Sequence, residues 1–284
     1  MKIKTVVAAA SFSIASAAML NAQVIISGYL ANPASTDSPY EYVQLVATRN
    51  LDFSVTPMAV VFANNGTATA NGWINGASLT YEMSLTTGTV SAGQSFYVGG
   101  SGMLIDGAGS TDISGLNWIR TLNTATTAGD LFGSAASGGV AGNGGSNADG
   151  IGVFNGLTLT TSSVPLDAVF YGSAVGSAFV TSSSGYTLPV NDLYGGGYLQ
   201  TASSLMSDPG SAQYTVLSGT YNTNTSTWIT GRTSSLVTLT TASDPSVIAS
   251  QISLSAAPAP EPSTLALTGL GLAAIGLFRR NRKA

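Results

Sequence analysis

The stretch Tyr40-Glu41-Tyr42-Val43-Gln44-Leu45-Val46-Ala47 decides the fold class, because its apolar side chains alternate along the chain. Val43, Leu45 and Ala47 fall on one face at a spacing of two residues, the period of a β-strand. We predict strands here and at the other short apolar runs, at 24–26, 58–62, 79–85, 95–98, 151–154, 157–160, 167–171, 214–217, 227–230, 236–239 and 247–254.

Turn signals separate these runs. The pairs Asn65-Gly66, Asn71-Gly72, Asn75-Gly76 and Asn155-Gly156 favour tight turns between antiparallel strands. Many short strands with turns between them predict an all-β fold, a sandwich or a barrel. One short helical turn is expected near 116–122.

The composition excludes several kinds of chemistry. The chain of 284 residues has no cysteine and no histidine, which removes disulfides, Cys/His zinc sites, cysteine nucleophiles and Ser-His-Asp triads. Between Gln23 and Pro260 only Arg49, Arg120 and Arg232 face twelve acids, a net charge of −9 (3 − 12). Such a body repels phosphate backbones, so we expect no nucleic-acid partner.

The first 22 residues have the pattern of a secretory signal peptide. Lys2 and Lys4 precede an apolar run at 6–20, and Leu20-Asn21-Ala22 places a small residue before Gln23. We expect a signal helix over 1–22 that signal peptidase cleaves between Ala22 and Gln23 after delivery by the secretion machinery. Cleavage after Ala17 or Ala18, and a retained N-terminal anchor, are the alternatives.

The C-terminal end combines a proline motif, an apolar run and a basic terminus. Pro260-Glu261-Pro262 closes a proline-rich linker at 256–262, and residues 263–278 carry no charge. Sixteen helical residues span roughly 24 Å, which predicts a short transmembrane helix within 263–284. Its apolar residues are Leu265, Leu267, Leu270, Leu272, Ile275, Leu277 and Phe278, and its basic stop is Arg279, Arg280, Arg282 and Lys283.

This tail resembles the PEP-CTERM sorting signal of Gram-negative envelope proteins. The resemblance implies an exosortase-type enzyme that cuts near Pro260-Glu261-Pro262, and an exported protein with an inner-membrane intermediate. The final place would be the cell envelope, the outer surface or the extracellular matrix, in association with exopolysaccharide and biofilm. The alternative is an ordinary C-terminal anchor that is never cut.

Three segments of the body resemble the lamin-tail domain, an immunoglobulin-like antiparallel β-sandwich. They are the stretch from Ile25-Ile26-Ser27-Gly28-Tyr29 to Leu45, the stretch Asp149-Gly150-Ile151-Gly152-Val153, and the stretch Leu166-Asp167-Ala168-Val169-Phe170-Tyr171-Gly172. The resemblance covers 23–175, and residues 176–255 are expected to add strands that complete or extend the sandwich, with a second, smaller β unit as the alternative. Gly28 and Gln44 stand where the family commonly has glutamate.

Candidate sites in the body are weak. Asp37 and Glu41 are close in sequence and could serve a glycan hydrolase, but Asp37 lies in a Ser/Thr/Pro turn, and we expect no catalytic residue. Residues 144–149 resemble a calcium nonapeptide in a single copy; we expect a flexible loop, no cofactor and no metal. A loosely bound Ca²⁺ near Asn143, Asn147 and Asp149 is the alternative.

Aromatic residues and glycosylation triplets complete the candidates. Trp73, Trp118, Trp228 and the eleven tyrosines could form a face that stacks on glycans, although core positions are the better interpretation. Asn65-Gly66-Thr67 and Asn224-Thr225-Ser226 fit the N-glycosylation pattern, and we interpret them as turns.

These observations together predict a non-catalytic structural protein of the envelope. A polysaccharide- or protein-binding surface module is the first alternative, and it would show an exposed row of aromatic side chains on one sheet face. A glycan hydrolase is the second, and it would need two acids that converge in a cleft.

Overall fold

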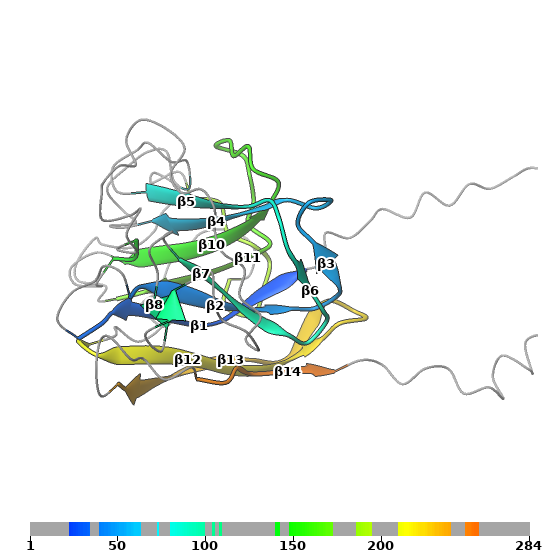
Figure 1. Ribbon diagram of the computed structural model, residues 1–284. Coiled ribbons are helices and arrows are strands. Elements are labelled where there is room, and N and C mark those ends of the chain that lie inside the picture. Colours follow the sequence, from blue (N-terminus) through cyan, green and yellow to red (C-terminus); the bar gives the residue numbers. More distant parts are fainter. Residues whose placement is uncertain are drawn as a thin grey trace, which may run out of the picture.

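The computed structural model describes residues 23–34, 40–63, 73, 80–99, 104–105, 108–109, 140–142, 148–172, 186–194, 210–239 and 248–255 (Figure 1). Every regular element within these ranges is a β-strand, so the all-β prediction is confirmed for them. No helix of this part of the chain is long and apolar enough to cross a membrane. The predicted signal helix, the turn near 116–122 and the C-terminal helix lie outside the described residues.

The larger sheet contains six strands, and it includes both the first and the last of the described strands. Its strands are β1 (Val24–Asn32), β2 (Tyr42–Ala47), β7 (Ser95–Gly99), β12 (Gln213–Asn222), β13 (Thr227–Thr238) and β14 (Gln251–Ser255). The order is β13-β12-β1-β2-β7 with antiparallel neighbours, while β14 pairs in parallel with the second half of β12. Strands from 210–255 therefore extend the sheet that β1 and β2 begin.

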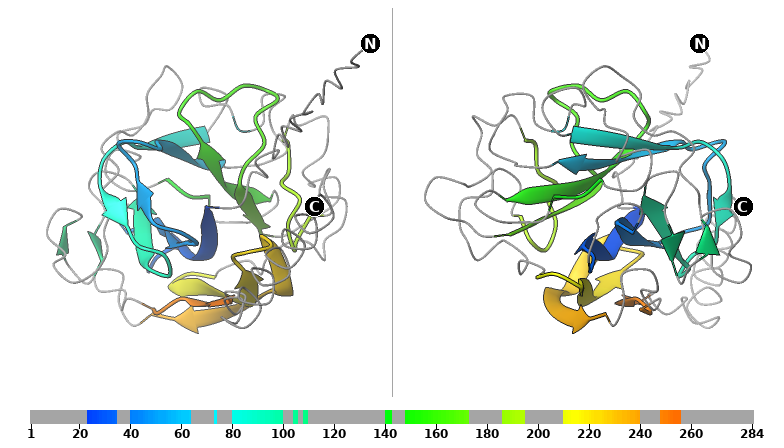
Figure 2. Two further views of the ribbon diagram at one scale, coloured as in Figure 1. Left: turned by 90° about the vertical axis from the view of Figure 1, so that its right-hand side faces the viewer. Right: turned by 60° about the vertical axis from the view of Figure 1, so that its left-hand side comes forward.

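The smaller sheet is antiparallel throughout. It contains β4 (Met58–Ala63), β5 (Thr80–Leu85), β10 (Asp149–Asn155) and β11 (Asp167–Tyr171), in the order β11-β10-β4-β5. Two short pairs complete the described strands: β3 (Leu51–Asp52) with β6 (Thr89–Val90), and β8 (Leu104–Ile105) with β9 (Ala108–Gly109). Figure 2 shows β4, β5 and β10 on the opposite side of the molecule from β12 and β13.

Three apolar layers hold the two sheets. The central layer lies between them and includes Val43, Leu45 and Ala47 from β2, the three residues whose alternation predicted one buried face. A second layer on the outer face of the smaller sheet includes Trp73, Phe154 and Phe170. A third layer on the outer face of the larger sheet includes Tyr42, Tyr97 and Tyr214. Both faces of β2 and β4 are therefore buried, which is why neither strand has an exposed residue.

Most predicted strands are confirmed, and four predictions are wrong in detail. The strand predicted at 247–254 begins only at Gln251, because residues 248–250 precede β14 without strand structure. Residues 157–160 form a loop, in which the apolar side chains of Leu157 and Leu159 pack against the second layer. The runs 227–230 and 236–239 belong to one strand, β13, although Leu239 lies just beyond its end. Asn155-Gly156 begins a long connection to β11 and is not a tight turn, although Gly156 has a φ of 84°. The other three Asn-Gly pairs lie outside the described residues.

The second glycosylation triplet lies in a turn, as predicted. Residues 223–226 connect β12 to β13, and the side-chain Oδ1 of Asn222 accepts hydrogen bonds from the backbone N–H groups of Asn224 (2.9 Å) and Thr225 (3.2 Å). An asparagine that binds the backbone two residues on is a common way to close such a turn. The triplet at 65–67 lies outside the described residues.

Gly28 lies beside a bulge in β1, where the pairing with β2 shifts between Ile26 and Gly28. A Cβ atom at this position would lie 2.3 Å from the hydroxyl oxygen of Tyr214 and 2.7 Å from the carbonyl oxygen of Thr215. The tyrosine of the neighbouring strand occupies the space of a side chain, so a glutamate does not fit in this packing.

We expect Gly28→Ala to lower the free energy of unfolding by about 1–3 kcal/mol, because the added methyl group forces the Tyr214 ring and the β12 backbone to shift. Urea denaturation would measure this loss of free energy of unfolding. Gly231→Ala on β13 is the matched control, since its nearest contact would be 3.6 Å from the Cβ of Asp192; its effect should stay within about 0.5 kcal/mol. Equal midpoints for the two variants would contradict the packing argument.

Buried tyrosines are a second property of this core. Tyr171 and Tyr214 are at most 1% exposed, and burial raises the pKa of both hydroxyls well above the usual value. Burial raises the pKa of the Tyr194 hydroxyl in the same way. The folded state therefore keeps these three protons at a pH where the unfolded chain releases them.

We expect stability to be unaffected by these groups below pH about 10 and to fall above it, by up to about 1.4 kcal/mol per pH unit for each of the three. Tyrosinate absorbance and circular dichroism followed together would show part of the tyrosines ionising only as the strands unfold. Ionisation of all eleven tyrosines near pH 10 with the circular dichroism unchanged would contradict this expectation.

Candidate functional site

The residues predicted for sorting and anchoring lie outside the described part of the chain. This applies to the motif Pro260-Glu261-Pro262, to the apolar residues from Leu265 to Phe278, to the basic stop and to Ala22. Gln23, the predicted first residue after cleavage, is described: it is 8% exposed and its carbonyl oxygen accepts a hydrogen bond from the backbone N–H of Thr48 (3.0 Å).

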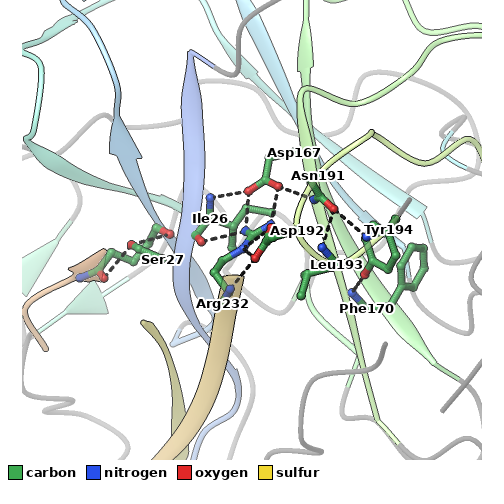
Figure 3. A network of polar contacts seen from close by, with 10 residues as sticks. Ile26, Ser27, Asp167, Phe170, Asn191, Asp192, Leu193, Tyr194 and Arg232 are labelled. Atoms are coloured by element: carbon green, nitrogen blue, oxygen red, sulfur yellow. Dashed lines mark hydrogen bonds and ion pairs between the residues drawn. The ribbon is translucent and has the colours of Figure 1, made fainter. Parts of the chain in front are cut away.

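The main polar site of the body is a buried ion network around Arg232 of β13 (Figure 3). The guanidinium donates Nη1 to Asp167 Oδ2 at 2.7 Å and Nη2 to Asp167 Oδ1 at 2.8 Å, a bidentate pair. Nη2 and Nε also donate to Asp192, at 2.7–3.1 Å, and the backbone N–H of Arg232 donates to Asp192 Oδ2 at 2.6 Å. We refer to Arg232, Asp167, Asp192, Asn191 and Ile26 as the Arg232 network.

The Arg232 network satisfies the backbone of Ile26 at the bulge of β1. The N–H of Ile26 donates to Asp167 Oδ2 at 2.8 Å, and its carbonyl oxygen accepts from Arg232 Nη1 at 3.2 Å. Asp167 begins β11 of the smaller sheet, whereas Ile26 and Arg232 belong to the larger one. The ion pair therefore links the two sheets at the point where the β1 ladder is irregular.

The segment 186–194 supplies the second carboxylate and orients it. Asn191 donates its side-chain amide to Asp167 Oδ1 (2.9 Å), and its own Oδ1 accepts from the backbone N–H groups of Leu193 and Tyr194 (2.9 Å each). The hydroxyl of Tyr194 accepts the N–H of Phe170 at 2.9 Å. These bonds fasten the segment across β11 and position Asp192 beside Arg232.

Arg232 stays protonated in spite of its burial. The side chain is fully buried, and desolvation alone would disfavour the cation, but the carboxylates of Asp167 and Asp192 more than offset it and raise the pKa of the guanidinium. Trp228 covers the guanidinium with its ring centroid 4.7 Å from Cζ, a cation–π contact. A small cavity of about 60 Å³ opens beside the network, lined by Ile25, Asp167, Val190, Ser226 and Trp228 among others.

Glu41 forms a second link between the sheets, at the opposite end of the sandwich. Its Oε2 accepts hydrogen bonds from the backbone N–H groups of Val140 and Ala141, and the side chain is fully buried. Tyr171 of β11 donates its hydroxyl to the carbonyl oxygen of Gly142 (2.8 Å) and stacks on Tyr29 of β1 at 4.7 Å. Glu41 thus fixes the segment that leads into β10, while Asp37 lies outside the described residues.

Gln44 makes neutral contacts within the larger sheet. Its Oε1 accepts from Ser27 Oγ and its Nε2 donates to the hydroxyl of Tyr97, both at 2.9 Å. The amide also donates to the carbonyl oxygen of Ile248, so it connects β2 to the segment before β14. An amide can serve donors and acceptors at once, which a carboxylate cannot.

The calcium alternative receives no new support. Asp149 is 2% exposed, and its carboxyl group lies against Gly142, where an added Cβ would meet it at 2.2 Å. Within the described ranges no three acidic side chains gather to hold a metal ion. Asn143 and Asn147 lie outside these ranges.

The described aromatic side chains are core residues with few exceptions. Trp73 is 2% exposed and packs edge-on against Phe154 and Tyr186, and its Nε1 donates to the carbonyl oxygen of Thr187. Of the aromatics that the structure describes, only Tyr40 and Trp228 are partly exposed. Trp118 lies outside the described residues.

Sequence reasoning missed the Arg232 network, although one signal was present. Arg232 is the single cation between Arg120 and Arg279, and it stands in a strand of Thr, Ser and aliphatic residues. A lone cation among uncharged strand residues is a candidate for a buried ion pair. Its partners could not be assigned, because Asp167 and Asp192 are 65 and 40 residues away.

We expect Arg232→Met to lower the free energy of unfolding by about 3–5 kcal/mol, because two carboxylates and the Ile26 carbonyl lose their partner. Arg49→Met, at an exposed arginine, is the matched control and should change stability by less than about 0.5 kcal/mol. If Arg232→Met does not fold, the triple variant with Asp167→Asn and Asp192→Asn should recover folding. Chemical denaturation measures all three, and equal stability of the two single variants would refute the role of the network.

Comparison with known proteins concerns the C-terminal end. Residues 258–283 match the sequence model of a family described as the PEP-CTERM protein-sorting motif. The comparison with curated proteins and that with solved structures found no match. The chain therefore carries a PEP-CTERM sorting signal, which implies export, recognition by an exosortase and a place at the cell envelope or surface of a Gram-negative bacterium.

Proposed function

We propose that this protein is a non-catalytic structural component of the cell envelope or extracellular matrix. In this proposal residues 1–22 direct export, residues 263–284 hold the protein in the inner membrane, and an exosortase cuts at Pro260-Glu261-Pro262 to release the body. The observation that carries the proposal is the sorting motif at 258–283, which begins three residues after Ser255, the end of β14.

We further propose that the body is an immunoglobulin-like sandwich similar to the lamin-tail domain. Its support is the position of the three resembling segments, which fall on β1 and β2, on β10 and on β11. Asp167 of the third segment binds the backbone of Ile26 in the first. The segments that carry the resemblance therefore include the residues that link the two sheets.

The non-catalytic role is supported by the way the buried acids are used. Glu41 binds two backbone N–H groups, and Asp167 and Asp192 bind Arg232 and further backbone N–H groups. A general acid or base needs access to its substrate, and these carboxylates have structural partners instead. The alternative of a polysaccharide-binding module would need an exposed row of aromatic side chains. Among the described residues, Trp228 beside the small cavity comes nearest to this requirement.

The processing step can be tested by intact-mass analysis of the protein from the envelope of a host that has an exosortase. We expect the wild-type chain to lack residues 265–284, and the variant Pro260→Ala, Glu261→Ala, Pro262→Ala to retain them and to stay in the membrane fraction. Pro258→Ala, a proline just outside the triplet, is the matched control and should be processed like the wild type. A mature wild-type chain that still carries residues 265–284 would establish a plain anchor in place of a sorting signal.

A further inference from the structure

We propose that one end of the sandwich docks on the surface of the phospholipid bilayer while the protein is still anchored; the proposal rests on the membrane-held intermediate of the proposed function. We call it the terminal end, and it comprises the start of β1, residues 48–49 after β2, the turn at 53–57, Val190, the turn at 223–226 with the start of β13, and Ser255. The terminal end lies on the right-hand side of the molecule in Figure 1. In the left-hand view of Figure 2 it faces the viewer.

Strand pairing places both ends of the described chain at the terminal end. β12 runs antiparallel to β1, so its last residue, Asn222, lies at the end where β1 begins with Val24. β14 runs parallel to β12 and pairs Ser255 with Asn222. The N–H of Thr223 donates to the carbonyl oxygen of Ser255 (3.0 Å), which fixes the exit of the chain beside the β12–β13 turn. The predicted signal peptide and the predicted span therefore leave the body on the same side.

The connection to the predicted span is short. Leu265 is ten positions after Ser255, with nine residues between them, and a fully extended chain covers at most about 3.3–3.6 Å per residue. The terminal end therefore remains within about 35 Å of the bilayer for as long as the span is inserted. When the distance between the terminal end and the bilayer is shorter than this limit, the loop tips of the terminal end reach the headgroup region.

The terminal end presents the most exposed aliphatic side chains of the described residues. Val190 is 84% exposed, Val55 77% and Ile229 57%. Val55 lies in the turn between β3 and β4, Val190 lines the small cavity together with Ser226 and Trp228, and Ile229 lies in the first part of β13. By contrast, Leu236 and Val237 on the far half of β13 are 37% and 39% exposed.

Aliphatic loop tips beside a partly exposed tryptophan suit the membrane interface, where apolar groups enter the boundary and indole rings sit at headgroup level. The charge at this end is small. Arg49 and Asp52 are both exposed, and Arg232 shares one positive charge between the carboxylates of Asp167 and Asp192, so these five groups sum to −1. A body of net charge −9 is repelled by anionic lipid, so the apolar side chains, and not the charges, favour this face.

Docking of this kind would depend on the anchor. A few aliphatic side chains bind a membrane weakly and reversibly on their own, and stable attachment needs a second element. With the span in place, the contacts orient the sandwich and hold Pro260-Glu261-Pro262 close to the membrane surface. Once the chain is cut, the remaining contacts are too weak to retain the body.

The absence of cysteine from the chain allows a direct test. The full-length protein would carry a single cysteine at Val190→Cys or Ile229→Cys, labelled with an environment-sensitive dye, in vesicles of neutral and anionic phospholipid. Val237→Cys on the far half of β13 is the matched control. We expect lipid-borne quencher to reduce the emission at 190 and 229 at least threefold more than at 237. Replacing Val55, Val190 and Ile229 together by threonine, with the label at Ser226→Cys, should abolish most of that quenching.

Co-flotation of the protein with the vesicles shows whether the C-terminal span is inserted, independently of the quenching that measures docking. Protein that floats but shows equal quenching at all three positions would overturn the docking proposal and leave the anchored intermediate intact. Protein that does not float would overturn the anchored intermediate itself. Shielding of 190 and 229 that arises only when an exosortase is co-reconstituted would assign this end to the enzyme and refute the lipid contact.

Discussion

The backbone of Ile26 is held on both sides by one ion pair, which links the two sheets at the terminal end. Its N–H binds Asp167 and its carbonyl oxygen binds Arg232, where the β1 ladder shifts register. Buried backbone groups need partners, and here charged side chains from β11 and β13 supply them. The same atoms bring Asp192 and the segment 186–194 onto the edge of the smaller sheet.

This arrangement suits an exported domain that has no disulfide. Without cysteine, the ends of the sandwich need non-covalent links, and there is one at each end: the Arg232 network at the terminal end and Glu41 with Tyr171 at the other. Three apolar layers fill the space between and outside the sheets. The cation of the Arg232 network is itself buried, and so are Glu41 and Asp167, the acids that make these two links.

Local sequence patterns predicted the strands well where the buried face of the strand requires apolar residues at regular positions. The alternation in β2 identified the face that meets the central layer, and residues 167–171 coincide with β11. The prediction of a strand at 157–160 is wrong, because apolar residues in a loop can cover a sheet from outside as effectively as a strand does. The two runs of β13 read as separate strands, since Gly231 and the inward-facing Arg232 interrupt the apolar pattern.

The all-β class, the exclusion of thiol and imidazole chemistry, and the sorting signal follow from the sequence alone, because alternation, composition and a contiguous motif are local properties of the chain. The carboxylates that bind Arg232, the lack of room for a side chain at Gly28, and the exit of both ends of the body from one side are known only from the folded chain. These features depend on contacts between residues as far as 206 positions apart. A pattern along the chain carries no record of such pairings, since many acids could have met the one arginine.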